Sequence, residues 1–206
     1  MKRLYIILLI GIISLPVNAQ LKFRYGLTAG LNLSTAVLPD LKINTNINSI
    51  LHGEDVIKGE PQLADVVSLY KGGVYFSLGG KIGNLKLSTT YTRTNIYKKI
   101  DMYIFSVEAL DILLDYIDVE ITYNLNLFKH FYISAGYIPS FLLQHEGNLD
   151  INDFDPRILT GFGFKFTNGI ALNFDAVFGI NEIIDGSYIH NLMIPITINI
   201  PLKNNG

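Results

Sequence analysis

Charged side chains stand at alternate positions of several apolar stretches, where they could conduct ions or form salt bridges. Every second residue of a strand faces the same side, so such charges would line one face. Acids and bases enclosed in a narrow interior should pair, because an unpaired buried charge is costly. They would form either an ion path gated by switchable salt bridges or a static polar plug, and a narrow interior favours the plug. The residues are Arg24, Lys81, Lys86, Asp118, Glu120, Lys165 and Asp175.

The sequence offers little for catalysis. His145 lies close to Ser140, as in a lipid hydrolase built on Ser and His, but five positions along a strand would place the two on opposite faces. No serine has a nucleophile-elbow context. We therefore expect no catalytic residue and no cofactor. The histidines also lack the i, i+4 spacing of a helical zinc pair: they are His52, His130, His145 and His190.

One polar stretch is rich in oxygen ligands. Asp150, Asn152, Asp153 and Asp155 could hold Ca²⁺ or, through a cation, a lipopolysaccharide phosphate. The stretch lacks the Gly and the distal Glu of a calcium loop. We favour an acidic, solvated loop and predict no metal site.

The elements that would position these charges are strands. From Ile117 to Leu125 apolar and polar residues alternate strictly, a pattern typical of a strand with one apolar and one polar face. The same period of two recurs along the chain and predicts eight strands. They cover about 23–34, 73–82, 85–97, 114–126, 130–144, 158–166, 170–180 and 189–202.

The connections alternate between long and short. Gly83-Asn84 and Asn168-Gly169 are two-residue hairpin signals. Residues 35–70 read as a long loop with a short helix near 63–69, and residues 98–112 as a second loop. Long and short connections then fall on opposite rims, which is the pattern of an outer-membrane barrel.

Composition fits an exported barrel of one domain. The chain has 206 residues, 49% hydrophobic and 17% charged, below the roughly 25% charge usual for a soluble protein. Residues 1–19 read as a signal peptide: Lys2 and Arg3, an apolar run, then a small-residue site ending at Ala19. Residues 20–206 would form the barrel. A net charge of −2 gives no electrostatic attraction for nucleic acid.

The predicted fold is all-β: an eight-stranded antiparallel up-and-down transmembrane β-barrel. The alternative is a soluble periplasmic ligand-binding barrel, which would turn its apolar face inward. Most of the predicted strands are long enough for the roughly 9–11 residues that cross a membrane. Their polar faces hold mainly small residues, which suit a narrow lumen.

Aromatic residues near the strand ends read as interfacial girdles. They are Tyr91, Tyr97, Tyr103, Tyr123, Phe128, Phe131, Tyr132, Tyr137 and Phe141.

Four stretches together resemble the PorT-like outer-membrane β-barrel family of Bacteroidota. They are R-Y-G-L-T-A-G-L-N-L-S (24–34), Y-I-D-V-E-I-T-Y-N-L (116–125), F-Y-I-S-A-G-Y (131–137) and G-F-G-F-K-F-T-N-G (161–169). The resemblance implies an eight-stranded barrel in the outer membrane of a Gram-negative cell, with some members tied to protein secretion. Such barrels often end on an aromatic residue, whereas this chain ends in Pro201-Leu202-Lys203-Asn204-Asn205-Gly206.

These observations together predict a monomeric structural or interaction protein that is not an enzyme. It would sit in outer-membrane lipid, display its extracellular loops and bind a secretion or envelope protein. The alternative function is a small pore or transporter.

Overall fold

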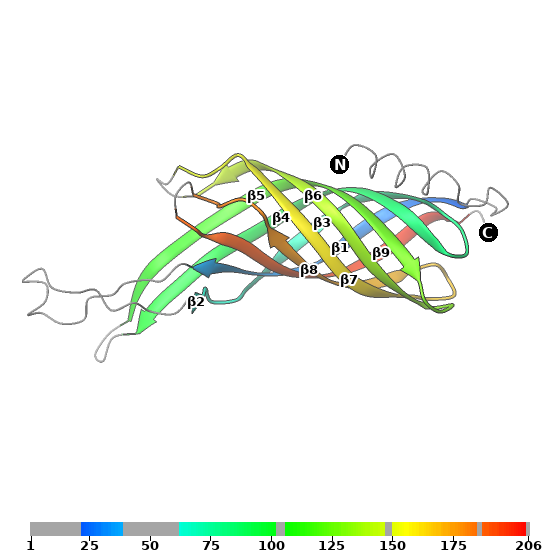
Figure 1. The fold of residues 1–206 in the computed structure, drawn as a ribbon, viewed down its shortest axis with the longest axis horizontal. Coiled ribbons are helices and arrows are strands. Elements are labelled where there is room, and N and C mark those ends of the chain that lie inside the picture. The colour runs from blue at the N-terminus through cyan, green and yellow to red at the C-terminus, as the bar shows by residue number, and fades with distance from the viewer. Residues whose placement is uncertain (1–21, 39–61, 102–105, 147–149, 185–186, 205–206) are drawn as a thin grey trace, which may run out of the picture.

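The chain folds into a closed barrel of eight long antiparallel strands (Figure 1). The computed structural model describes residues 22–38, 62–101, 106–146, 150–184 and 187–204. The predicted signal peptide and Tyr103 lie outside these ranges. The strands are β1 (Lys22–Leu38), β2 (Gln62–Leu63), β3 (Val67–Gly79), β4 (Gly83–Asp101), β5 (Ser106–Asn126), β6 (Phe131–His145), β7 (Phe154–Lys165), β8 (Ala171–Gly179) and β9 (His190–Asn204).

The topology is up-and-down. Each long strand pairs antiparallel with the next one along the chain, and β1 pairs with β9 to close the ring. The two-residue strand β2 pairs with the end of β1 that lies beyond β3, with Leu63 opposite Val37. The predicted eight-stranded antiparallel barrel is confirmed, and closure leaves no open sheet edge around the barrel wall.

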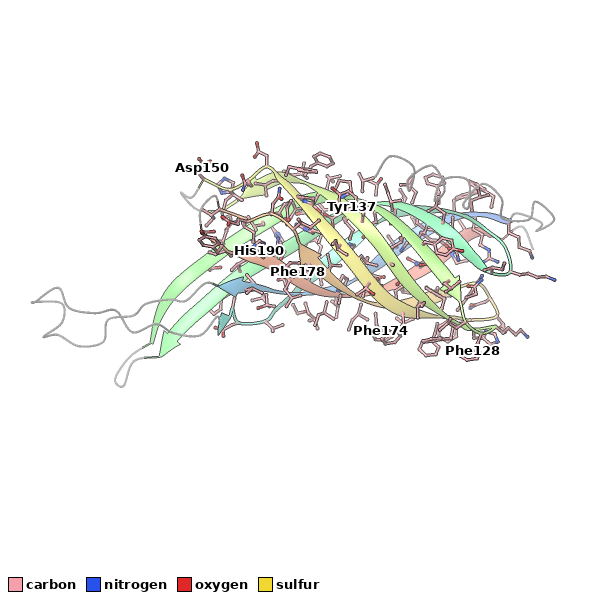
Figure 2. The ribbon with its side chains drawn as sticks, viewed as in Figure 1. Phe128, Tyr137, Asp150, Phe174, Phe178 and His190 are labelled. Atoms are coloured by element: carbon pink, nitrogen blue, oxygen red, sulfur yellow. The ribbon has the colours of Figure 1, made fainter. Side chains whose placement is uncertain are left out.

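The wall is apolar outside and polar inside. On β8, Asn173 and Asp175 are buried in the lumen, whereas Phe178 is exposed. Figure 2 shows Phe128 and Phe174 standing out from the ribbon. This arrangement follows from the period of two, and it is the reverse of a soluble ligand-binding barrel, which keeps its apolar face inside.

The turn between β7 and β8 refines the predicted hairpin. Gly169 has a φ of 87°, whereas Asn168 does not have a positive φ. The Gly169 N–H donates to the Phe166 carbonyl (3.0 Å), and Phe166 N–H donates to the Ile170 carbonyl (2.8 Å). A two-residue type I′ turn needs positive φ at both central residues, so this hairpin is instead a three-residue turn closed by a glycine bulge.

Strands extend into both of the predicted long loops. β1 runs on to Leu38 and β3 already begins at Val67, so the short helix predicted near 63–69 is wrong. Residues 39–61 of that loop lie outside the described ranges. β4 continues to Asp101, and β5 already begins at Ser106. The two strands form a hairpin that extends beyond the other strands (Figure 1). Alternation fades there because the hairpin leaves the two-sided environment of the wall.

Among the described residues there is no helix long and apolar enough to cross a membrane. We call the end of the barrel with the β3–β4, β5–β6 and β7–β8 turns the short-turn end, and the opposite end the long-loop end.

Candidate functional site

A chain of six alternating charges crosses the lumen. Lys86 on β4 lies 3.8 Å from Glu120 on β5, and Glu120 also pairs closely with Lys71 on β3. Lys71 Nζ lies 3.4 Å from Asp118 Oδ2, and the other oxygen of Asp118 lies 3.2 Å from Arg157 Nη1 on β7. The chain ends at Asp155, whose Oδ2 accepts a 2.7 Å hydrogen bond from Arg157 Nε. Three cations and three carboxylates therefore balance.

Neighbouring polar groups complete the coordination of the carboxylates. Thr92 donates to Asp118 over 2.6 Å, and Ser88 donates to Glu120 over 2.7 Å. Asn191 Nδ2 donates to Asp155 over 2.9 Å. The guanidinium carbon of Arg157 lies 4.2 Å from the centre of the Tyr116 ring, which adds a cation–π contact. Asp118 and Arg157 are fully buried, so only such partners can offset the loss of their hydration.

The chain of charges obstructs the lumen. β3 and β7 stand on opposite sides of the ring of eight strands, and Asp118 contacts Lys71 from the first and Arg157 from the second. The charges therefore bridge opposite walls. This is the geometry of a polar plug, because an ion crossing here would have to separate buried ion pairs.

A second polar layer lies nearer the short-turn end. Asp175 accepts a 3.0 Å hydrogen bond from Ser134 and forms no ion pair with another described residue. The Tyr132 hydroxyl donates to Asn173 Oδ1. Tyr132 therefore points into the lumen, which corrects its predicted place in an interfacial girdle.

An apolar cluster closes the long-loop end. Ile96 from β4 and Leu114 from β5 point inward and are fully buried. Ile151 and Ile183 fold over them from the β6–β7 and β8–β9 connections, held by an N–H bond from Asn152 to the Ile183 carbonyl (2.9 Å). The lumen is thus filled by side chains above the charges as well.

The outer surface changes character at the same level. Arg93 on β4 and Asp115 on β5 face outward and form two hydrogen bonds of 2.8 and 3.1 Å. Arg93 also lies over the outward-facing Tyr70, which stacks on Tyr91. Below this level apolar residues face out, and above it Ile96 and Leu114 face in. On β4 and β5 the inward-facing side chains therefore change from polar to apolar near this level.

The structure separates the seven residues predicted to share the lumen. Lys86, Asp118 and Glu120 belong to the chain of charges, and Asp175 lies in the layer below it. Arg24 and Lys165 lie at the mouth of the short-turn end, where both line a small cavity.

Lys81 is not a lumen residue. It is exposed in the turn between β3 and β4, because β3 ends at Gly79 and the Gly80 N–H bonds to the Gly83 carbonyl (2.9 Å). The turn predicted at Gly83-Asn84 is therefore displaced toward the N-terminus, and Lys81 leaves the alternation of the strand.

The prediction missed Lys71, Asp155 and Arg157, half of the chain of charges. Each lies just before the start of the strand assigned from the sequence. Extending the alternation backward from Val74 places Lys71 inward, and extending it from Ile158 places Arg157 and Asp155 inward. The signal was present in the sequence, but glycines and Pro156 interrupted it.

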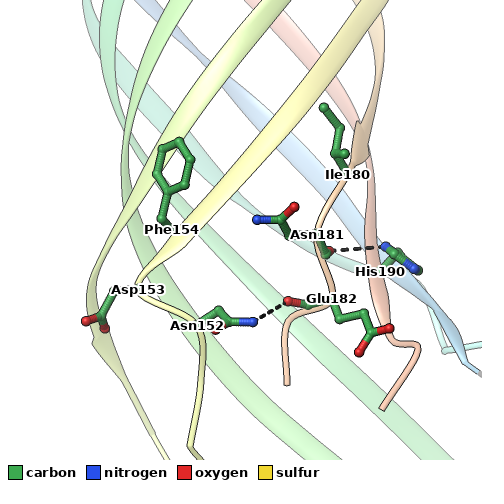
Figure 3. A pocket seen from close by; sticks show the side chains of 7 residues that line it. All are labelled: Asn152, Asp153, Phe154, Ile180, Asn181, Glu182 and His190. Atoms are coloured by element: carbon green, nitrogen blue, oxygen red, sulfur yellow. Dashed lines mark hydrogen bonds between the residues drawn. The ribbon is translucent and has the colours of Figure 1, made fainter. Parts of the chain in front are cut away.

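The acidic stretch does not form one site. Asp155 belongs to β7 and lies in the lumen, so it is not part of a solvated loop. Asn152 instead donates to the Glu182 carbonyl over 2.8 Å, beside an open hollow of about 710 Å³ at the long-loop end (Figure 3). His190 lines the same hollow and contacts the Asn181 carbonyl. The described residues contain no cluster of three His, Cys, Asp or Glu side chains able to hold a metal ion.

His145 and Ser140 face the same side, contrary to the expectation from simple alternation. A register shift between Asp115 and Tyr116 in the β5–β6 pairing inserts one extra residue in β6, so His145 pairs with Leu114 and Ser140 with Asp118. Those partners are four residues apart, roughly 13 Å along a strand. The two side chains are therefore too distant to act as nucleophile and base.

Comparisons with known proteins find likeness only among solved structures. No model of a protein family matches the chain, and no curated protein sequence matches it. Ail, the attachment invasion locus protein of Yersinia pestis, aligns over 85% of this chain and 96% of its own, at 7% identity and a TM-score of 0.44. Ail in complex with the heparin analogue sucrose octasulfate aligns over 86% and 97%, at 7% identity and a TM-score of 0.38. At these values the likeness carries no argument about function.

Proposed function

We propose that the chain is an outer-membrane barrel that acts as a structural or interaction protein and displays the β4–β5 hairpin outside the cell. The observation that carries the proposal is the reversal of polarity along the wall. Apolar side chains cover the outside of the barrel up to Arg93 and Asp115, and beyond them Ile96 and Leu114 face inward. A lipid environment that ends at this level accounts for the apolar outer face below it and for the inward-facing apolar residues above it.

A filled lumen favours an interaction role over a pore. The charges bridge opposite walls, and the cluster around Leu114 fills the space above them. Eight strands enclose a space that side chains just fill. The interior therefore supports a rigid scaffold, and the surface elements are left to carry the function.

The β4–β5 hairpin is the element best suited to contact a partner. The ladder between β3 and β4 ends at Lys71 opposite Thr92, and β6 pairs with β5 only as far as His145 opposite Leu114. β4 and β5 nevertheless pair with each other up to Asp101 opposite Ser106. Beyond the barrel their outer edges lack a continuous neighbouring strand among the described residues, so a partner's extended segment can add to them.

The resemblance of the strands to the PorT-like family indicates what kind of partner the hairpin would bind. It is supported by the signal-peptide pattern and by strand motifs such as the one at 116–125. A protein of the secretion machinery or of the envelope would then be the partner, and the barrel itself would be monomeric and without catalytic activity.

Shortening the hairpin tests the proposal. A variant lacking residues 98–109 should insert normally, because the deletion lies beyond the part of the ladder that β3 and β6 share. Chemical crosslinking in intact cells should give a partner adduct with the parent chain and lose it with this variant. Substituting Lys129, in a turn at the other end, provides the control and should keep the adduct. An undiminished adduct with the shortened hairpin would contradict the proposal.

A further inference from the structure

The short-turn end of the barrel has basic residues and no acidic ones. Asp and Glu are absent from residues 22–39, 66–100, 121–145, 156–174 and 186–206, which include every turn and strand terminus at this end. The nearest carboxylates, Glu120 and Asp175, are buried deeper in the lumen, where Glu120 pairs with two lysines and Asp175 accepts a hydrogen bond from Ser134. This end therefore carries a positive field. Its basic residues are Lys22, Arg24, Lys81, Lys129, Lys165 and Lys203.

Three of these cations gather at the mouth of the lumen. Lys22 and Arg24 from β1 and Lys165 from β7 line one cavity of about 40 Å³. A single water needs roughly 10–15 Å³ of such space, so the cavity accommodates one small group of a few heavy atoms. Ser77, Asn84 and Asn126 complete its polar lining.

The cations of the mouth have no counterion in the part of the chain that the structure describes. Among the described residues, no ion pair involves Lys22, Arg24 or Lys165. The Nε of Arg24 is buried and has no hydrogen-bond partner within the described part of the chain. Deeper in the same lumen, Lys71, Lys86 and Arg157 are all matched with carboxylates. The mouth thus holds three cations that form no ion pair within the described part of the chain.

We propose that Lys22, Arg24 and Lys165 form a binding site for a phosphate group. Three positive charges around a space for one small group favour a phosphate, which offers several acceptor oxygens. A guanidinium donates to such oxygens through a planar fork, and the two ammonium groups add point charges. The unpartnered Nε of Arg24 would then have an acceptor.

A phosphate at this position has two sources. Lys22 and Lys165 are each followed by an exposed aromatic ring, Phe23 and Phe166. Aromatic rings beside lysines are typical of the headgroup region of a membrane, so the headgroup of an anionic phospholipid is one source. This source rests on the membrane location proposed above. Free phosphate from the surrounding solution is the other source and does not depend on that location.

Binding measurements on the purified full chain in non-ionic detergent test the site. Inorganic phosphate is titrated by calorimetry, and retention of phosphatidylglycerol is compared with that of phosphatidylcholine by native mass spectrometry. The test variant is Arg24→Gln with Lys165→Gln. The matched control is Lys81→Gln with Lys129→Gln, which removes the same charge from exposed turns outside the cavity.

The parent chain should bind at least one probe. The test variant should weaken that binding by about tenfold or more, because it removes charge-assisted contacts, whereas the control should remain within about twofold. Binding of inorganic phosphate identifies the soluble source, and selective retention of phosphatidylglycerol identifies the lipid. No binding of either probe, or equal losses in both variants, would overturn the site.

Folding is followed separately, so that failure of the site and failure of the barrel remain distinguishable. Each preparation is run unboiled on a gel, where a folded barrel keeps its shifted band. If the double variant loses that band, Lys165→Gln alone serves, since this side chain is only half-buried. Loss of the folded band in the parent chain would count against the barrel and not against the cations of the mouth.

Discussion

At the scale of residues, Arg157 on β7 links its own part of the wall to β5 inside the barrel. It is fully buried and contacts Asp155, Asp118 and the Tyr116 ring. A buried ion pair adds little net stability over a well-packed apolar pair, but removing one partner leaves the other charge unmatched. The contribution of Arg157 is therefore best seen when it alone is removed.

Replacing Arg157 with Leu should destabilise the barrel by about 3–5 kcal/mol, because, among the described residues, Asp155 loses its only cation and Asp118 loses one of two. Urea unfolding in lipid vesicles, followed by far-ultraviolet circular dichroism and by the unboiled gel band, measures the change. These probes suit a chain without tryptophan.

Two further variants check the cause. Adding Asp155→Asn to Arg157→Leu should recover part of the loss, since one of the stranded charges is removed. Lys81→Leu, in an exposed turn, should leave the unfolding curve unchanged. Equal stability of Arg157→Leu and the parent chain would show that the buried charges do not support the barrel.

At the scale of elements, the turns decide where each strand begins. The β7–β8 turn depends on Gly169, whose φ of 87° places it in a region that costs other residues about 1–2 kcal/mol. The Asn168 side chain assists by accepting a 3.1 Å bond from the Ile170 N–H.

Gly169→Ala should therefore lower the free energy of unfolding by about 1 kcal/mol, and Gly169→Asn by less, because Asn tolerates positive φ. Thr167→Ala, at an exposed position of the same turn, is the matched control and should have little effect. The same urea titration measures all three. Equal curves for Gly169→Ala and Thr167→Ala would argue against the positive-φ turn.

The sequence predicts the faces of the strands better than their ends. Within the wall, the outer face is apolar and the inner face packs a polar lumen, so the period of two is strict and Ile117 and Asp118 could be assigned to their faces from the sequence. Strand ends depend on turn geometry and on register shifts, which a local pattern does not encode. The turn beginning at Gly80 removed Lys81 from the lumen, and the extra residue in β6 turned His145 inward.

The candidate site was half predictable for the same reason. Lys86, Asp118 and Glu120 lie in uninterrupted stretches, and each was placed inside from the alternation alone. Asp155 and Arg157 flank Pro156, just before the predicted start of the strand at Ile158. Which acid pairs with which base was beyond reach, because the contacts between β3, β5 and β7 depend on closure of the ring.

At the scale of the whole molecule, three layers follow one another along the barrel. The short-turn end carries unmatched cations, the middle carries balanced charges inside an apolar wall, and the long-loop end carries an apolar cluster beneath the connections. The two ends of the barrel therefore differ in charge and in polarity. This order fits a molecule whose basic end faces the periplasmic leaflet and whose β4–β5 hairpin faces outward.

Membrane fractionation combined with gel mobility tests whether the chain is an outer-membrane barrel. The chain should be recovered in the outer-membrane fraction of its host, and its band should run at a different position unboiled than boiled, because the closed barrel resists detergent until heated. Recovery in the soluble periplasmic fraction, with one mobility before and after boiling, would contradict the lipid-facing assignment of residues such as Ile121 and Phe162.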